Sequence, residues 1–164
     1  MSHLYKYWGI EVFILSILAI SSALIAEHVF KLVPCQMCLH QRYTYYFIII
    51  IFLIFYFIKK TSNIFLYLLI EFSIFYGLFY SIWHVAVERK ILKGPQGCSG
   101  GIEKTSSTDI LKEQILNQRI VDCSNITWEI FGMSAALINT ILLLIIVFFN
   151  SMFIIRMYYD KEKK

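Results

Sequence analysis

Long apolar segments separated by short polar breaks dominate the hydropathy pattern of the chain. A membrane-spanning helix needs about 20 mostly apolar residues. Four segments approach or exceed that length: about 8–26, 40–58, 64–87 and 130–155. The pattern predicts an all-α membrane protein, a bundle of four transmembrane helices that forms a single integral membrane domain over residues 1–164.

The polar breaks between these segments differ in length. Residues 59–63 predict a tight turn between the second and third helices, residues 27–39 a short first loop, and residues 88–129 one long loop. Because four helices cross in alternating directions, the short loop and the long loop must lie on the same face of the membrane. A cleaved signal is a second interpretation of the first segment, but its apolar region is long and Glu11 interrupts its start, so we expect an uncleaved helix.

The composition agrees with a membrane protein. The chain is 59% hydrophobic and 16% charged, whereas a soluble domain carries about 25% charged residues. The net charge of +4 is small, and many lysines cluster at segment ends, so nucleic-acid binding has no support.

Lysine and arginine set the expected orientation. The basic residues are most densely placed near the two termini and in the turn at 59–63. Because such residues are enriched in cytoplasmic segments, we expect both termini in the cytoplasm and both longer loops on the opposite, oxidising side.

All four cysteines, Cys35, Cys38, Cys98 and Cys123, fall in those two loops. Disulfides persist on the oxidising side of the membrane. Four cysteines permit three connectivities, so the residues alone leave the pairing open.

Cys35 and Cys38 form a Cys-x-x-Cys pair where the polar break gives way to the second segment. Pro34 suits the entry to a helix, so the pair is expected at the first turn, where the helix dipole stabilises a thiolate. Arg42 lies four residues after Cys38 on the same helical face and adds a positive charge. These features favour thiol–disulfide exchange; half of a zinc site or an inert structural bridge are the alternatives.

Cys98 and Cys123 are separated by a longer stretch. Gly94 and Pro95 place Cys98 on a turn-rich segment. A plain bridge between them would stabilise the fold by roughly 3.5 kcal/mol. A zinc site of four cysteines normally uses two close-spaced pairs, which disfavours a metal here. Between them, residues 106–121 predict a short amphipathic helix.

Three further polar residues in or beside the apolar segments are candidates. His84 is expected at the outer end of the third helix, as an interfacial residue or as a donor to a ligand near the cysteine pair. Glu71 and Glu11 are intramembrane acids, hence functional candidates by default, although each is also explained by pairing with a cytoplasmic lysine.

Taken in order, these motifs resemble the disulfide bond formation protein B (DsbB) family of bacterial inner-membrane thiol oxidases. The resemblance covers nearly the whole chain. The matching residues are His28, Pro34-Cys35-Gln36-Met37-Cys38, Arg42, Trp83-His84-Val85-Ala86-Val87-Glu88, Gly94-Pro95-Gln96-Gly97-Cys98, Asp122-Cys123 and Trp128-Glu129-Ile130-Phe131-Gly132-Met133-Ser134. One position departs from the pattern: His40 stands where the family often has an aromatic residue.

The resemblance implies an enzyme with two redox-active disulfides, Cys35–Cys38 and Cys98–Cys123, in the periplasmic loops. It implies that Cys98 and Cys123 oxidise a periplasmic, thioredoxin-fold dithiol oxidase of the DsbA type. Cys35 and Cys38 then reoxidise that pair and pass two electrons to a membrane quinone, ubiquinone or menaquinone.

Residue by residue, the resemblance implies that Cys98 meets the partner, Cys35 exchanges with the loop pair and Cys38 contacts the quinone. Arg42 and His84 would bind the quinone, and no metal is implied. The competing hypotheses are a structural four-helix membrane protein whose disulfides only staple its outer loops, and a metal-binding membrane protein.

Overall fold

Four long helices account for nearly all of the fold in the computed structural model, which describes residues 2–95, 123–124, 126, 129–130 and 132–162. The elements are α1 (Ser2–His28), α2 (Gln36–Phe57), α3 (Ile64–Glu88), β1 (Glu129–Ile130), β2 (Met133–Ser134) and α5 (Ala135–Glu162). The predicted all-α bundle of four helices is therefore confirmed. The amphipathic helix expected at 106–121 lies outside the described residues.

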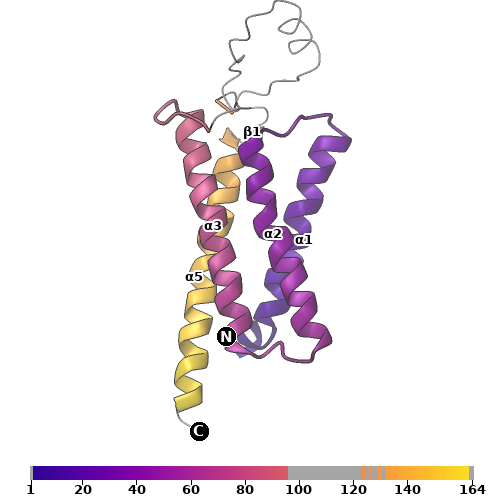
Figure 1. Cartoon of the computed structure of the whole chain (residues 1–164), viewed down its shortest axis with the longest axis vertical. Helices are drawn as coiled ribbons and strands as arrows, with labels where there is room; N and C mark the ends of the chain where they lie inside the picture. Colours follow the sequence, from indigo (N-terminus) through magenta and orange to yellow (C-terminus); the bar gives the residue numbers. More distant parts are fainter. Residues whose placement is uncertain (1, 96–122, 125, 127–128, 131, 163–164) are drawn as a thin grey trace, which may run out of the picture.

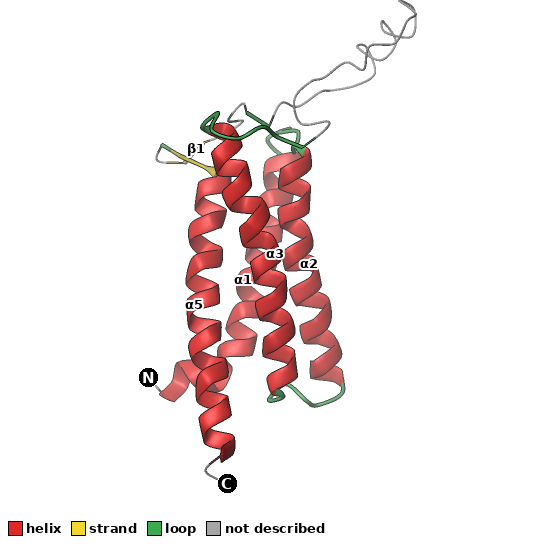
Figure 2. Cartoon of the chain, turned by 60° about the vertical axis from the view of Figure 1, so that its left-hand side comes forward, coloured by secondary structure: helices red, strands yellow, loops and turns green. Residues whose placement is uncertain are grey.

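The helices stand side by side with both termini at one end of the bundle (Figure 1). α3 packs most extensively against α5 and α2, and α1 packs mainly against α2 (Figure 2). The start of α2, where the cysteine pair lies, is at the end opposite the termini. We call these the cysteine end and the terminal end.

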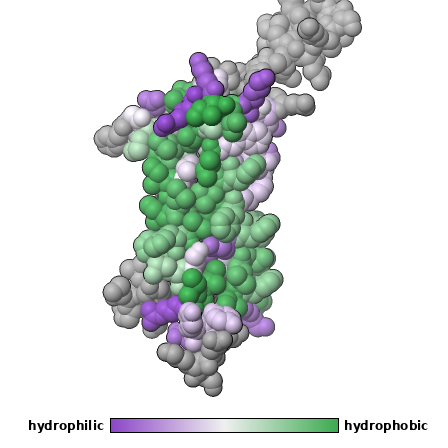
Figure 3. Space-filling model, turned by 90° about the vertical axis from the view of Figure 1, so that its left-hand side faces the viewer, coloured by the Kyte–Doolittle hydropathy of each residue, from purple (hydrophilic) through white to green (hydrophobic). Residues whose placement is uncertain are grey.

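Each of the four helices contains a stretch long and apolar enough to cross a membrane. These stretches are Tyr7–His28, Gln36–Phe57, Ile64–Glu88 and Ala135–Asp160. The surface accordingly shows a broad hydrophobic band with hydrophilic side chains gathered toward both ends (Figure 3). Large side chains such as Phe57 and Phe72 are about three-quarters exposed on this band, as expected where lipid replaces water.

Two helix starts differ from the sequence-based boundaries. α2 begins at Gln36 rather than near residue 40, so Cys35 is its N-cap and Cys38 lies in its first turn. α5 begins at Ala135 rather than at 130, because β1 and β2 form a short antiparallel hairpin with Ile130 opposite Met133. Gly132 adopts a φ of 73° in the turn between the strands, a conformation that glycine tolerates without steric cost.

Small residues allow α2 and α3 to approach closely. A Cβ atom on Gly77 would lie 2.5 Å from the Thr44 hydroxyl oxygen, so no larger residue fits without a shift. Ser73 Oγ donates to the Thr44 carbonyl at 3.2 Å. Such small-residue contacts are the usual way in which membrane helices pack, and they fix α2 against α3 beneath the cysteine end.

A buried polar cluster, here called the terminal-end network, joins α1, α3 and α5. Trp8 Nε1 donates to Asn150 Oδ1 at 3.0 Å, and Asn150 Nδ2 donates to Glu71 Oε2 at 2.6 Å and to the Tyr67 carbonyl at 3.0 Å. Ser151 donates to Glu71 Oε1. Glu71 is thus held by hydrogen bonds from α5, rather than by the cytoplasmic lysine that the sequence offered as an explanation.

Candidate active site

The cysteine pair lies where an extended segment becomes α2. Cys35 is the N-cap residue, with extended backbone (φ −73°, ψ 166°), and its sulfur accepts from the backbone N–H of Cys38 at 3.3 Å. Both cysteines are free thiols, with their sulfur atoms 3.0 Å apart. The expectation that the pair sits at the first turn of this helix agrees with this geometry.

Cys35 is the residue of the pair that favours the thiolate. The hydrogen bond with the Cys38 side chain lowers the pKa of the Cys35 thiol to about 4, in spite of its burial. The His84 side chain and the backbone N–H of Cys38 lower this pKa further. Because Cys35 accepts the N–H of Cys38, we place the charge on Cys35 and the shared proton on Cys38.

Cys35 faces the segment that carries Cys123. Cys35 and Cys123 belong to one buried cluster with Met37 and Val87, and Cys38 packs against that cluster. Cys123 is 1% exposed and disulfide-bonded, and its partner lies outside the described residues. The structure therefore brings Cys35, Cys38 and Cys123 together, whereas Cys98 falls in the part of the chain that is not described.

His84 lies against Cys35, on the same side as Cys123. Its Nε2 atom is 3.5 Å from the Cys35 sulfur and 3.8 Å from Glu88 Oε1, and the ring also hydrogen-bonds to the backbone of Cys123. Glu88 is in turn held by Ser134 of β2. His84 is thus placed to act on Cys35.

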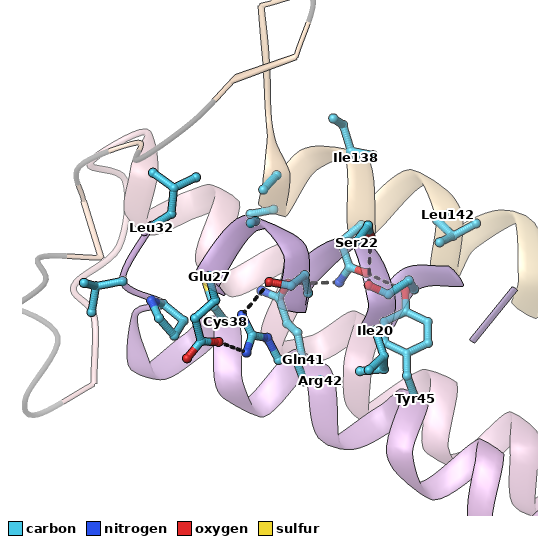
Figure 4. A pocket seen from close by; sticks show the side chains of 18 residues that line it. Ile20, Ser22, Glu27, Leu32, Cys38, Gln41, Arg42, Tyr45, Ile138 and Leu142 are labelled. Carbon is cyan, nitrogen blue, oxygen red and sulfur yellow. Dashed lines mark hydrogen bonds and ion pairs between the residues drawn. The ribbon is translucent and has the colours of Figure 1, made fainter. Parts of the chain in front are cut away.

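Cys38 faces a cavity on the other side. The cavity has a volume of about 280 Å³ and lies between α1, α2 and α5. Ile20, Leu32, Cys38, Gln41, Arg42, Tyr45, Ile138 and Leu142 surround it (Figure 4). Neither Cys35 nor His84 contributes to this wall. Only Cys38 of the pair therefore lines the cavity, although both cysteines adjoin the cluster that contains Cys123.

Arg42 brings a fixed positive charge to the same cavity. Its guanidinium pairs with Glu27 of α1 at 2.5 Å and reaches the Ala23 carbonyl at 3.4 Å (Figure 4). The Arg42 side chain is 13% exposed. A mostly apolar cavity with a thiol and a guanidinium in its wall suits a flat apolar ring that carries polar oxygen atoms.

A chain of buried amides links His84 to this cavity. Gln41 Nε2 lies 3.1 Å from His84 Nδ1, and Asn139 Nδ2 donates to Gln41 Oε1 at 2.9 Å. Tyr45 donates to Asn139 Oδ1. Gln41, Asn139 and Tyr45 all line the cavity, so a continuous path of hydrogen bonds joins the wall to Cys35.

Sequence reasoning missed four residues of this site: Glu27, Gln41, Tyr45 and Asn139. Two carried a usable signal. Gln41 follows Cys38 by three residues and so shares its helical face, and Asn139 is a polar residue inside an apolar span. The contacts of Glu27 and Tyr45 depend on which helices become neighbours.

His40, the position that departs from the family pattern, lies on another face of α2. Its ring stacks on Tyr80 with centroids 4.5 Å apart, and its Nδ1 lies 3.0 Å from the Tyr76 hydroxyl. It does not contribute to the wall of the cavity. His40 therefore contributes to the contact between α2 and α3 rather than to the cavity.

One group of side chains among the described residues has the composition of a metal site. The ligand atoms of Cys35, Cys38 and His84 all lie within 4.8 Å of one another. Two thiolates and an imidazole are typical zinc ligands. A metal hypothesis for this chain therefore rests on these three residues rather than on the four cysteines.

Comparison with known proteins gives one family and one relative. The family model described as "Disulfide bond formation protein DsbB" matches residues 6–153. An uncharacterized protein of Rickettsia prowazekii (strain Madrid E), RP370, is 29% identical over 162 residues, which cover 98% of this chain and 92% of that protein. No solved structure gives a significant match.

Proposed function

The chain belongs to the DsbB family of membrane disulfide oxidoreductases, and from that membership we propose that it is a quinone-dependent thiol oxidase. In this proposal it reoxidises a periplasmic DsbA-like dithiol oxidase and thereby sustains disulfide bond formation. The electron acceptor is a quinone of the bilayer, ubiquinone or menaquinone.

The proposed reaction consists of three exchanges that conserve electrons. Two thiols of the partner reduce the Cys98–Cys123 disulfide and become a disulfide themselves. The thiols of Cys98 and Cys123 then reduce Cys35–Cys38. Finally Cys35 and Cys38 form their disulfide again, and the two electrons and two protons they release convert a quinone to a quinol.

The single observation that carries this proposal is the position of the cysteine pair between two different neighbours. Cys35 is part of the buried cluster that contains Cys123, whereas Cys38 packs against that cluster and alone of the pair lines the cavity. Thiol–disulfide exchange requires a direct approach of sulfur to sulfur, which suits Cys35 for the exchange with the loop pair. We assign the exchange with the acceptor to Cys38.

The cavity wall is chemically suited to a quinone head group. Its volume of about 280 Å³ lies just below the range of about 300–1,000 Å³ for small-molecule sites. A single ring fits that volume, and an isoprenoid tail would extend into the bilayer. We propose that Arg42 donates to a carbonyl oxygen of the ring, with Glu27 holding the guanidinium in place.

The proposal includes an orientation. We place both termini in the cytoplasm and the cysteine end on the periplasmic side of the bacterial inner membrane. The density of lysine and arginine near the termini and in the 59–63 turn supports this orientation.

Turnover by purified protein tests the proposal. We expect the full chain, supplied with quinone, to oxidise a reduced thioredoxin-fold dithiol, and Cys38→Ser to stop quinone reduction. Leu39→Ser introduces the same side chain at the next position, which is 38% exposed and outside the cavity wall, and should leave turnover intact. Equal activity of the Cys38→Ser variant would contradict the proposal.

Companion measurements identify the cysteine that meets the partner and distinguish the competing functions. In Cys123→Ser we expect a mixed disulfide between Cys98 and the partner to accumulate. Protein that keeps both disulfides throughout, without turnover, would support a stapling role. Stoichiometric zinc on reduced protein, lost in His84→Ala, would support a metal site at Cys35, Cys38 and His84.

A further inference from the structure

The side-chain amides of Gln41 and Asn139 are linked by hydrogen bonds, and the donor and acceptor of each bond are determined by the Ala136 carbonyl at the end farthest from Cys35. The carbonyl oxygen of Ala136 can only accept hydrogen bonds. Thr140 Oγ1 donates to it at 2.8 Å and Ser81 Oγ at 3.1 Å, while the two hydroxyl oxygens lie 2.7 Å apart. Ser81 comes from α3, Ala136 and Thr140 come from α5, and Ser81 is fully buried.

Both hydroxyl protons are used within this cluster, so Ser81 can only accept a hydrogen bond from Asn139. Ser81 and Thr140 have one hydroxyl proton each, and three contacts within the cluster compete for them. Neither proton is left over for Asn139, which lies 3.2 Å from Ser81 Oγ. The Asn139 group that faces Ser81 must therefore be its NH₂, and its carbonyl oxygen faces the Tyr45 hydroxyl.

The orientation of Asn139 decides that of Gln41. The second proton of the Asn139 amide points to Gln41, so Gln41 presents its carbonyl oxygen to Asn139 at 2.9 Å. Its NH₂ then lies toward His84 Nδ1 at 3.1 Å. Gln41 is 6% exposed, so water does not compete readily for these contacts.

Resting on the proposed thiol oxidase function, we propose that Gln41 and Asn139 are positioning residues that hold neutral His84 with its proton on Nε2. A ring nitrogen that accepts from an amide cannot carry a proton itself. The N–H of His84 thus faces the Cys35 sulfur, 3.5 Å away. The bond from the ring to the backbone of Cys123 also requires a ring N–H, and only Nε2 is available for it.

This arrangement gives His84 a defined role in the exchange steps. With its proton on Nε2, the ring donates to Cys35 and does not take a proton from it. When the second loop cysteine, as its thiolate, attacks the loop sulfur of a mixed disulfide at Cys35, a bond forms between the two loop sulfurs and the Cys35 sulfur leaves with the electron pair of the broken bond. The His84 N–H stabilises that thiolate, and no proton is transferred in the step.

Nitrogen NMR of histidine-labelled protein tests the inference directly. The full chain is reduced and studied in detergent at a pH well above the ordinary imidazole pKa of about 6.5. The His84 signals are assigned by their loss in His84→Asn. We expect a protonated Nε2 and an unprotonated Nδ1, with a preference of about tenfold, the effect of one well-formed hydrogen bond. A protonated Nδ1 overturns the inference.

Asn139→Asp should reverse the tautomer of His84, and the signals of His40 serve as an internal control. A carboxylate only accepts, so Gln41 should turn its NH₂ to residue 139 and its carbonyl oxygen to His84, which moves the ring proton to Nδ1. The signals of His40, which lies on another face of α2, should not change. An unchanged His84 tautomer in folded Asn139→Asp overturns the inference, and if the variant does not fold, the native spectrum still decides.

Failure of this inference can be told apart from failure of the proposed function. Quinone reduction is measured on the same native sample. A protonated Nδ1 in an active enzyme overturns only the positioning role, whereas an inactive protein with the expected tautomer contradicts only the oxidase.

Discussion

Two polar networks lie at opposite ends of the bundle and share α3 and α5, but they differ in the groups at which they end. At the cysteine end, the chain from Ala136 to His84 finishes on the sulfur of Cys35. At the terminal end, the bonds around Glu71 and Asn150 run between helices and reach no redox-active group among the described residues. Both networks satisfy polar groups inside a membrane-length bundle, as the low-dielectric environment requires.

The contrast shows when an intramembrane polar residue indicates function. Glu71 attracted attention in the sequence because an acid inside an apolar span is a functional candidate by default. The structure gives it two donors from α5 and a place in a closed network, which accounts for it structurally. The amides at the cysteine end were less conspicuous in sequence, yet they adjoin the reacting sulfur.

The largest expected difference between the networks is the negative charge of the Cys35 thiolate at the cysteine end. Because the pKa of Cys35 is lowered to about 4, its ultraviolet thiolate absorbance should persist in reduced protein at pH 6. An ordinary thiol of pKa about 8.5 is less than about 1% ionised at that pH. The contribution of this group to the stability of the reduced protein is complete above its ordinary pKa and is lost as the pH falls through about 4.

Two variants sharpen the pH experiment. Cys35→Ser should remove the absorbance at pH 6, and Glu71→Leu in the other network should leave it unchanged. Absorbance that develops only above pH 8 in native protein would contradict the assignment of the thiolate to Cys35.

Arg42→Ala should have the next largest effect. Loss of a charge-assisted hydrogen bond, worth about 1.5–3 kcal/mol, should raise the apparent KM for quinone about 10- to 100-fold. The exchange between the loop pair and Cys35 should change far less, because the guanidinium faces the cavity. Arg156→Ala removes an arginine at the terminal end and is the control; equal effects of Arg42→Ala on both steps would remove Arg42 from the quinone site.

Glu71→Leu tests the structural role of the terminal-end network. The substitution removes one of the two acceptors of the buried Asn150 amide and the acceptor of Ser151, which should lower the free energy of unfolding by about 1–3 kcal/mol. Glu71→Gln should be much milder, since Ser151 can reverse and accept from the new amide. Denaturant unfolding measures both variants. A loss of quinone reduction per folded molecule in Glu71→Leu would show that this network also serves the reaction.

Ser134→Ala is expected to have the smallest effect, although it lies at the cysteine end. Ser134 Oγ accepts from the Leu137 N–H at the start of α5 and donates to Glu88. Loss of such a cap should lower the free energy of unfolding by about 1 kcal/mol, which denaturant unfolding measures. Rates of both redox steps should stay within about twofold of native, and a larger loss would extend the site to Glu88.

The sequence predicted the parts of this site that depend on one helix. Pro34 and the start of an apolar segment placed the pair at the first turn of α2, and helical periodicity placed Arg42 on the face of Cys38. Periodicity alone did not separate the roles of the two cysteines; only the family resemblance assigned Cys35 to the loop pair and Cys38 to the quinone. The contact of Gln41 with Asn139 joins residues 98 positions apart, and no local pattern specifies it.

The start of α5 shows the same limit. The apolar character of the segment continues through residues 130–134, so hydropathy extends the helix to Ile130. Because β1 pairs with β2 around Gly132, the helix begins only at Ala135. A hairpin with strands of two residues depends on one glycine conformation and on contacts outside the segment, so hydrophobic periodicity cannot predict it.

The central claim, that the Cys35–Cys38 pair passes two electrons to a quinone, is tested most directly by a single turnover. Fully reduced protein is mixed with one equivalent of quinone without oxygen, and quinol and remaining thiols are counted by absorbance and by mass mapping. The account predicts one quinol for two lost thiols, with a new disulfide between Cys35 and Cys38 at the earliest time. Quinone that stays oxidised, or a first disulfide that excludes Cys38, would contradict it.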